Sequence, residues 1–261
     1  TTQNLAALDL DAYVKGLLEL PLEGKIAGIL HTENDSMADA VISDRTNLLY
    51  GTEYIYETVL GLQFKISPFS FFQTNTKSAE RLYDRARSYV GDTKDAVIFD
   101  LYSGTGTIAQ LLAPVAKKVI GVELNEAAVH DARVNVKMNK IQNVDIYSND
   151  AGRFMVDVAE EGDSIDVVFM DPPRSGSTEE FMSSVITLGP KRVVYISCGP
   201  ESLARDLKYM IKNGYQVIKM TPVDMFPLTR GVETVCLLIN KNVNTKQHVN
   251  VSNYAEEYHK I

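Results

Sequence analysis

From residue 96 onward, short apolar runs alternate with stretches of helical periodicity, and this alternation restricts the possible folds more than any other feature of the chain. The runs with the length and composition of strands are 96–101, 118–122, 144–147, 165–170, 193–197, 215–220 and 232–239. Helical patterns separate the first six, which predicts a mostly parallel sheet covered on both faces. Only the loop 222–231 separates the last two, so we expect them to form an antiparallel hairpin at one edge.

The first 67 residues follow a different pattern. Residues 5–20 are predicted to form one helix. Short antiparallel strands are predicted for three apolar runs that turn residues interrupt, namely 27–30, 38–42 and 58–61. We therefore expect a small α+β companion region at 1–67, an α/β domain at 68–240 and a polar tail at 241–261.

Composition excludes several classes of protein. Hydrophobic residues make up 45% of the 261-residue chain, which is enough for a folded core and excludes disorder of the whole. No apolar run has the length of a membrane span, and the N-terminus lacks the pattern of a signal peptide, so we expect no membrane partner. The two cysteines are too few for a disulfide framework, which predicts a cytoplasmic location. The cysteines and histidines show no metal-ligand spacing, and we expect a monomer without bound metal.

The charge of the chain is negative overall but unevenly distributed. The net charge of −8 argues against a protein dedicated to binding nucleic acid. Residues 191–230, however, contain seven Lys or Arg and only three acids. We therefore expect this part of the surface to be able to meet a polyanion.

A glycine-rich turn closes the first strand of the alternating region. Gly104 and Gly106 stand between a strand and a helix, where they let the backbone approach a ligand closely. Ala109 replaces the third glycine of a dinucleotide-binding fingerprint, which argues against a nicotinamide cofactor. Glu123 ends the second strand, where a carboxylate typically holds a ribose. Asp150 follows the third strand, and its position is equally compatible with contact to an adenine and with an ordinary helix cap.

These strand ends resemble the S-adenosylmethionine site of Rossmann-like methyltransferases. In that family the sheet has seven strands and ends in an antiparallel hairpin, as expected above for residues 96–240. The resemblance implies an α/β fold class, with a Rossmann-like seven-stranded methyltransferase sheet and an antiparallel C-terminal hairpin, preceded by a small α+β region. It also implies S-adenosylmethionine as the cofactor.

Two further strand ends carry residues suited to chemistry. The fourth strand ends in Asp171-Pro172-Pro173-Arg174, and its prolines fix the backbone beside the expected methyl donor. Methyltransferases that act on amino groups have an aromatic residue in place of Arg174, so transfer to an exocyclic amine is disfavoured. Cys198 ends the fifth strand. By position alone, such a cysteine is more often a buried core residue than a functional one.

Methylation of carbon gives this cysteine a role. A pyrimidine C5 becomes nucleophilic when a thiolate adds to C6, and a base must then remove the C5 proton so that the thiol can leave. Cys198 is positioned to be that thiol, and Glu233, at the start of the last strand, is a candidate base.

The motifs around these residues resemble those of the RNA uracil-5-methyltransferases over about residues 25–240. They are Phe72-Gln73-Thr74-Asn75, Asp171-Pro172-Pro173-Arg174-x-Gly176, Val193-Val194-Tyr195-x-Ser197-Cys198, and Asp224-x-Phe226-Pro227-x-Thr229 followed by Val232-Glu233. By this resemblance Cys198 is the nucleophile and Glu233 the general base. The resemblance also implies cofactor-binding or site-lining roles for Gln73, Tyr102, Gly104, Gly106, Thr107, Glu123, Asp150 and Asp171. The residues expected to contact the RNA substrate are Phe72, Arg174 and Arg230.

Three residues beside the expected chemistry depart from the family pattern. Gly199 stands where members have Asn, Gly231 where they have His, and Leu228 where they have a polar residue. We also expect this sequence to be without the small N-terminal RNA-binding barrel of this family, and its two cysteines are too few for the cluster that holds an iron–sulfur centre. Because it begins with Thr1 rather than Met, we expect a processed chain or a fragment, with weak affinity for RNA.

We therefore expect a methyltransferase that uses S-adenosylmethionine to methylate C5 of a uridine in structured RNA, through a covalent adduct between Cys198 and C6. The frequency of substrates in the family favours 23S rRNA over tRNA. Two alternatives stay open at this point. One is an N- or O-methyltransferase on the same fold, in which Cys198 would be dispensable. The other is an RNA-binding module that has lost its chemistry through the changes at Gly199 and Gly231.

Overall fold

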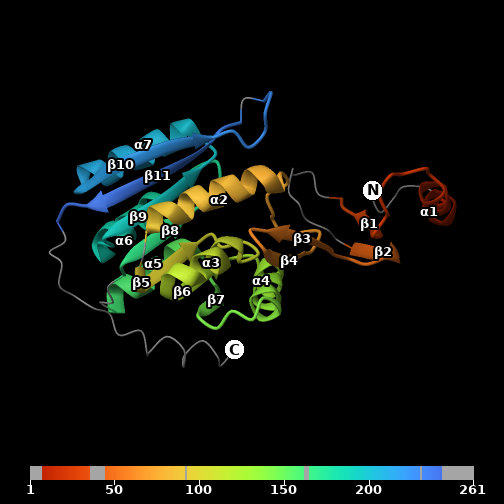
Figure 1. The fold of residues 1–261 in the computed structure, drawn as a ribbon, viewed down its shortest axis with the longest axis horizontal. Coiled ribbons are helices and arrows are strands. Elements are labelled where there is room, and N and C mark those ends of the chain that lie inside the picture. Colours follow the sequence, from red (N-terminus) through yellow and green to blue (C-terminus); the bar gives the residue numbers. More distant parts are fainter. Residues whose placement is uncertain (1–7, 36–44, 92, 162–164, 230, 243–261) are drawn as a thin grey trace.

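The computed structural model describes residues 8–35, 45–91, 93–161, 165–229 and 231–242, and a seven-stranded sheet forms its centre (Figure 1). In spatial order the strands are β10 (Tyr215–Val223), β11 (Glu233–Asn240), β9 (Arg192–Ser197), β8 (Val167–Met170), β5 (Thr93–Leu101), β6 (Ala116–Glu123) and β7 (Val144–Ser148). Strands β5 to β9 run parallel, whereas β11 is antiparallel to both β9 and β10. The predicted sheet and its C-terminal hairpin are confirmed.

Helices cover both faces of this sheet. They are α2 (Thr76–Val90), α3 (Thr107–Leu112), α4 (Glu126–Met138), α5 (Ala151–Glu161), α6 (Glu179–Leu188), α7 (Pro200–Lys212) and the short 3-10 helix η1 (Ala113–Val115). Because side chains alternate along a strand, Ile98 of β5 lies in the core under α2, α3 and α4, and Phe99 lies in the core under α5, α6 and α7. Among the described residues, no helix has the length and apolar character needed to cross a membrane.

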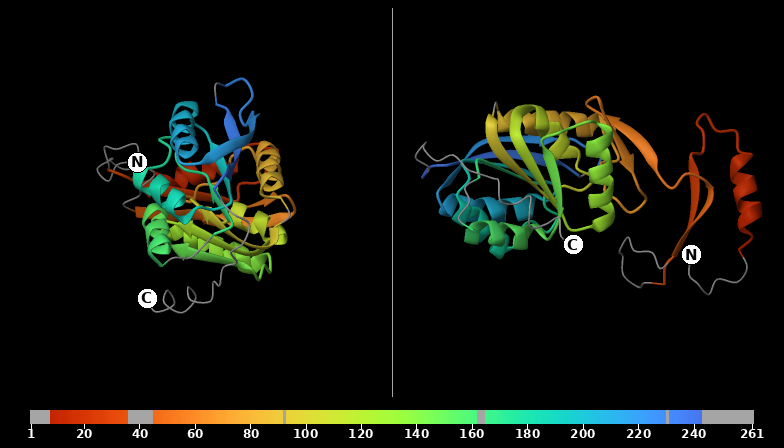
Figure 2. Two further views of the ribbon diagram at one scale, coloured as in Figure 1. Left: turned by 90° about the vertical axis from the view of Figure 1, so that its left-hand side faces the viewer. Right: turned by 90° about the horizontal axis from the view of Figure 1, so that it is seen from below.

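The N-terminal part of the chain stands away from this sheet (Figures 1 and 2). Helix α1 spans Leu10–Leu18, inside the range predicted for it, and β1 (Gly28–Glu33) pairs antiparallel with β2 (Arg45–Gly51). The strand predicted at 38–42 lies outside the described residues. All of α1 and β2 is described and neither contains a buried residue, while β1 contains one, Ile29.

A second hairpin, formed by β3 (Ile55–Val59) and β4 (Leu62–Ile66), packs against the helices of the main sheet. The strand predicted at 58–61 is wrong in its bounds, because Leu60 and Gly61 form the turn between β3 and β4. Their φ angles of 47° and 83° are the left-handed values that a two-residue hairpin turn requires. Val59 and Phe64 are completely buried in the core that includes α2. The boundary placed at residue 67 stays a prediction.

Two side chains, one in α4 and one at its C-terminal cap, pair with the edge of β4 as a neighbouring strand would. The Asn135 side chain accepts the N–H of Lys65 at 2.7 Å and donates to its carbonyl at 3.1 Å. Asn139 makes the same two bonds to Gln63, at 3.1 and 2.8 Å. Four residues of helix and two residues of strand both rise about 6–7 Å, so the two spacings match. This pairing satisfies backbone groups that a sheet edge otherwise exposes.

Candidate active site

Most of the predicted site residues lie at one end of the main sheet, where its parallel strands have their carboxyl ends. The residues at this edge, in chain order, are the turn 102–107 after β5, Glu123 at the end of β6, Asp150 after β7, Asp171 after β8 and Cys198 after β9. In an open α/β sheet, the carboxyl ends of the strands are the usual place for a ligand. The topology therefore brings together residues from five separate segments.

The glycine turn and Glu123 contact each other directly. The Gly104 N–H donates to Glu123 Oε2 at 2.9 Å, and the Asn125 N–H donates to Oε1 at 2.7 Å. Gly104 and Gly106 have φ angles of 55° and 73°, and a Cβ on Gly106 would lie 3.0 Å from the Cβ of Ala132. The turn thus requires glycine for its backbone conformation, and it leaves a carboxylate beside a strand-to-helix junction.

Asp150 and Tyr102 lie on the same side of this turn. Asp150 Oδ1 accepts the N–H of Arg153 at 2.9 Å, so the helix-cap interpretation of Asp150 is correct for one of its oxygens. Burial, together with the charge of Asp150, raises the pKa of Tyr102 to about 12. The Tyr102 ring packs on Phe181, with centroids 5.7 Å apart. Thr107 is buried within hydrogen-bonding distance of Thr105, at 3.1 Å.

Asp171, Asp100 and Glu233 form a group of acids that influence one another, and the sequence analysis assigned no role to Asp100. Burial, together with the charges of Glu233 and Asp100, raises the pKa of Asp171 to about 8. Asp100 is completely buried, and burial raises its pKa to about 7 even though Ser103 donates to it at 2.8 Å. Its Oδ1 atom has no hydrogen-bond partner among the described residues. The sequence signal for Asp100 was an acid at the end of an otherwise apolar strand.

These acids fit a ligand that carries positive charge. Tyr83 of α2 faces the same group, and burial together with the charges of Asp171, Asp100 and Glu233 raises its pKa. Carboxylates whose negative charges repel one another are stabilised by a nearby cation. S-adenosylmethionine carries a positively charged sulfonium and an ammonium group. The buried carboxylates and the glycine turn therefore suit this molecule. Among the described residues, no three His, Cys, Asp or Glu side chains form a group suited to a metal ion.

Cys198 lies at the end of β9, in a tight turn that leads into α7. The Gly199 N–H donates to Ser197 Oγ at 3.1 Å, which holds the backbone on both sides of the cysteine. Cys198 is partly exposed and lines a cavity of about 630 Å³. The other residues lining it are Arg174, Ser175, Gly199, Pro200, Glu201, Ser202, Arg205 and Gly231. The second cysteine, Cys236, is completely buried in the core, as its apolar surroundings in the sequence indicate.

Glu233 lies beside Cys198 because of the register between β9 and β11. Thr234 pairs with Ser197 in this antiparallel pair, so the next position brings Glu233 opposite Cys198. Burial raises the pKa of Glu233, and the nearby Arg174 guanidinium partly offsets that rise. Arg174 therefore connects the two groups, since it lines the same cavity as Cys198 and its charge acts on Glu233.

The departures from the family pattern have structural correlates. A Cβ on Gly199 would lie 2.8 Å from the Arg174 carbonyl oxygen and 2.7 Å from Ser202 Oγ, so Asn at this position requires the neighbouring loop to move. Gly231 lines the same cavity as Cys198. Leu228 is fully exposed, and its φ of 72° is a left-handed value that a leucine rarely adopts.

The segment 67–75 packs against α4 and the β3–β4 hairpin, although one of its three phenylalanines stays largely exposed. Asp131 Oδ2 accepts from the Ser67 N–H at 3.0 Å and from Ser70 Oγ at 2.9 Å. The predicted substrate residue Phe72 packs on Phe64, with ring centroids 5.9 Å apart. The neighbouring Gln73 is buried, and both residues line a cavity of about 440 Å³ next to the β3–β4 hairpin.

Of the remaining predicted substrate residues, Arg174 lines the cavity at Cys198, and Arg230 lies outside the described residues. The structure therefore brings the predicted nucleophile, base and Arg174 together on one side. It places Glu123 and the glycine turn together on the other.

Comparison with known sequences relates this chain to RNA methyltransferases. A family model described as tRNA (uracil-5-)-methyltransferase matches residues 41–241. A relative from Clostridium tetani, named an uncharacterized RNA methyltransferase, is 46% identical over 234 residues, which are 90% of this chain and 51% of the relative. Another RNA methyltransferase of that description, from Caldanaerobacter subterraneus, is 46% identical over 82% of this chain and 47% of its own length. The chain spans about half the length of these curated relatives.

Solved structures agree with this match. The crystal structure of Pyrococcus abyssi tRNA (uracil-54, C5)-methyltransferase, in complex with S-adenosyl-L-homocysteine, aligns with a TM-score of 0.70 and 32% identity. The alignment covers 83% of this chain and 52% of that one. Precorrin-6y C5,15-methyltransferase from Geobacter metallireducens aligns with a TM-score of 0.52 at 16% identity, over 62% of this chain and 88% of its own, so it shows a common fold alone.

Proposed function

Because this chain belongs to the tRNA (uracil-5-)-methyltransferase family, we propose that it methylates C5 of a uridine in RNA with S-adenosylmethionine as the methyl donor. The observation that carries the proposal is the register of β9 and β11, which brings Glu233 opposite Cys198. A thiol and a base on the same side of the sheet are what carbon methylation needs and what transfer to nitrogen or oxygen does not.

Cys198 performs the first step in this proposal. Its thiolate forms a bond to C6 of the uracil ring, and the C5–C6 π electrons move toward the C4 carbonyl, which makes C5 nucleophilic. The partly exposed position of the cysteine, on the wall of a cavity of about 630 Å³, leaves room for a base turned out of its stack.

Glu233 completes the reaction. S-adenosylmethionine supplies a methyl group in electrophilic form, and C5 takes that group while the donor becomes a neutral thioether. Glu233 then accepts the C5 proton, the C6–S bond breaks, and the Cys198 thiolate is restored. Burial raises the pKa of Glu233, which suits a base that must accept a proton near neutral pH.

The chain's own residues suggest how the donor is held. With the donor bound, the backbone of Gly104 and Gly106 would lie close to it, and the Glu123 carboxylate beside Gly104 would serve as a hydrogen-bond acceptor. The buried acids Asp100 and Asp171 suit its cationic groups. The target RNA is proposed as structured RNA, with 23S rRNA as the first substrate to test and tRNA as the second.

Trapping the covalent adduct tests this function. The protein is incubated with S-adenosylmethionine and 5-fluorouridine-substituted transcripts of 23S rRNA or tRNA, and a denaturant-resistant protein–RNA adduct is sought. Fluorine cannot leave as a proton, so the adduct should persist. Cys198→Ala should abolish it, and Cys236→Ala, at a buried cysteine in the same sheet, should leave it intact if the variant folds.

Each other outcome has a defined meaning. Methylation by Cys198→Ala would favour an N- or O-methyltransferase. Binding of RNA without any methyl transfer would favour a module without activity. Glu233→Gln should accumulate the adduct on unmodified RNA, and normal turnover by that variant would remove Glu233 from the role of base.

A further inference from the structure

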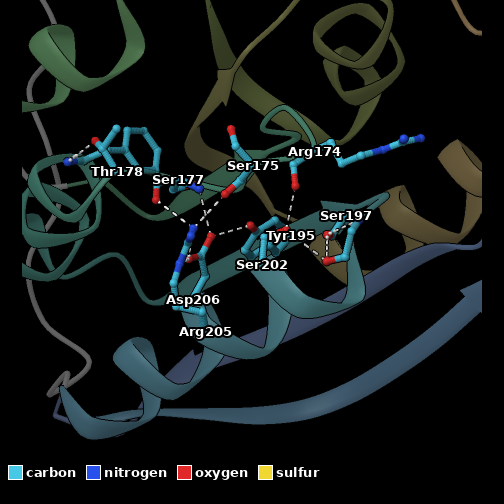
Figure 3. A network of polar contacts seen from close by, with 11 residues as sticks. Arg174, Ser175, Ser177, Thr178, Tyr195, Ser197, Ser202, Arg205 and Asp206 are labelled. Carbon is cyan, nitrogen blue, oxygen red and sulfur yellow. Dashed lines mark hydrogen bonds and ion pairs between the residues drawn. The ribbon is translucent and has the colours of Figure 1, made fainter.

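A buried carboxylate joins three elements beside the nucleophile. Asp206 lies on α7, and its side chain accepts from Tyr195 Oη at 2.7 Å and from the Ser177 N–H at 2.9 Å (Figure 3). Tyr195 belongs to β9, three residues before Cys198, and Ser177 belongs to the loop that follows β8. Asp206 is only 2% exposed, so these bonds form away from bulk water.

The Arg205 side chain, also on α7, donates hydrogen bonds both to Asp206 and to the same loop. Its Nε donates to Asp206 Oδ1 at 2.9 Å, which pairs the buried charge. Its Nη2 donates to the carbonyl oxygens of Ser175 and Ser177, at 2.9 and 3.2 Å (Figure 3). A lysine has no planar fork of donors and cannot reproduce this arrangement.

The loop lies so close to the pair that glycine is required at its centre. A Cβ on Gly176 would lie 2.5 Å from Arg205 Nη2 and 2.7 Å from Asp206 Oδ2, and the φ of Gly176 is 78°. Nearer the cysteine, Ser202 Oγ donates to the Arg174 carbonyl at 2.9 Å. The second half of the loop 171–177 is therefore bonded to α7 at three positions, Arg174, Ser175 and Ser177.

This loop carries the charges that surround the proposed base. The groups that face Glu233 are Arg174 and Asp171 from the loop, Tyr83 from α2 and, by register, Cys198 from β9. Arg174 lowers the pKa of Glu233 against the effect of burial. A displacement of the loop would move Arg174 away from both Glu233 and Cys198.

We propose that Arg205 and Asp206 are positioning residues, which hold the loop 171–177 on α7 so that Arg174 stays beside Glu233 and Cys198 during methyl transfer. The proposal rests on the proposed function for its kinetic consequence. The anchoring itself is a property of the fold, and it can be measured without turnover.

Asp206→Asn tests the proposal directly. The amide cannot accept both donors and pair with Arg205 as the carboxylate does, so backbone hydrogen exchange in residues 172–178 should accelerate. The turnover number should fall about tenfold to a hundredfold, because small displacements near reacting atoms have effects of that size. The acidic limb of the pH–rate profile should move to higher pH, because Glu233 loses the influence of Arg174.

A matched control separates positioning from general loss of stability. Asp166 also accepts a backbone N–H, from Val97 at 3.4 Å, and pairs with Lys191 at 2.8 Å, but it directly precedes β8 and so lies at the amino ends of the parallel strands, away from Cys198. Asp166→Asn should leave the pH profile and the exchange of 172–178 unchanged. If Asp206→Asn does not fold, Arg205→Lys and Gly176→Ala act on the same contacts and should give the same shift.

Two results would overturn the proposal: unchanged exchange in the loop, or faster exchange with the turnover number and pH profile of the Asp166→Asn control. Failure of the proposed function has a different signature. In that case the unaltered protein forms no methylated uridine, and the exchange measurement still decides whether Arg205 and Asp206 anchor the loop.

Discussion

The seven-stranded sheet and the N-terminal α1–β1–β2 region differ sharply in what they bury. In the sheet, every residue of β8 and the last six residues of β5 are buried. In the described N-terminal region, α1 and β2 contain no buried residue, and β1 contains only Ile29. A two-stranded sheet with one helix has too little apolar area for a core of its own, whereas a sheet covered on both faces has ample area.

The β3–β4 hairpin shows that sequence position does not decide which region a segment belongs to. It follows β2 after a few residues, yet Val59 and Phe64 lie in the core of the sheet and Asn135 pairs with its edge. The comparison therefore predicts that substitutions in the sheet and in this hairpin change the free energy of unfolding strongly. Substitutions in α1, β1 and β2 should change it little.

The largest difference should come from aromatic truncation. Phe64→Ala removes a completely buried ring and should lower the free energy of unfolding by about 3–5 kcal/mol. Tyr50→Ala, in β2 at 43% exposure, should change it by about 0.5 kcal/mol or less. Urea denaturation of both variants measures this, and a similar loss in both would break the distinction between the two regions.

A second test uses the buried acid of the sheet. The pKa of Asp100 is raised to about 7 from an ordinary value of 3.8, so its contribution to stability is fully present below pH 3.8 and is lost as the pH rises through about 7. Each pKa unit by which the folded and unfolded states differ corresponds to about 1.4 kcal/mol in the free energy of unfolding. Asp100→Asn removes this loss, so the variant should be a few kcal/mol more stable than the parent at pH 8 and close to it at pH 4. Thermal unfolding at the two pH values checks this, and a pH-independent difference would contradict it.

The pairing of α4 with β4 should have an intermediate effect. Asn135→Ala leaves the N–H and carbonyl of Lys65 without their partner and should lower the free energy of unfolding by about 1–3 kcal/mol. Asn47→Ala in β2 removes only an exposed bond to Arg45 and should cost about 0.5 kcal/mol or less. Equal losses would mean that the pairing with β4 contributes nothing specific.

The smallest expected effect is that of substituting glycine for leucine, which should change the free energy of unfolding in opposite directions in the two regions. Leu228 is exposed and has a φ of 72°, so Leu228→Gly should raise the free energy of unfolding by about 0.5–1 kcal/mol, since glycine adopts that conformation without steric strain. Leu48→Gly, in the extended strand β2, should lower it by about the same amount. Calorimetry of both variants decides, and destabilisation by Leu228→Gly would indicate that the side chain has a packing role.

Sequence reasoning predicted most of the sheet because hydrophobic periodicity reports local burial. The seven strands, the antiparallel end of the sheet and the position of Cys198 at a strand end all followed from it. The second hairpin was less accessible, since the run 58–61 combines a strand end with the turn at Leu60 and Gly61. Asp100 was missed because an acid at a strand end has the same pattern whether it faces water or the core.

The sequence by itself determined which residues lie at the strand ends, because the hydrophobic periodicity of strands and helices is a local property that short segments display. Only the tertiary structure decided which of those ends meet. Glu233 lies opposite Cys198 through the register of β9 and β11, and Asp206 joins Tyr195 to Ser177 across three elements. Such contacts depend on how distant segments pack and on which polar groups become buried together, and no local pattern specifies either.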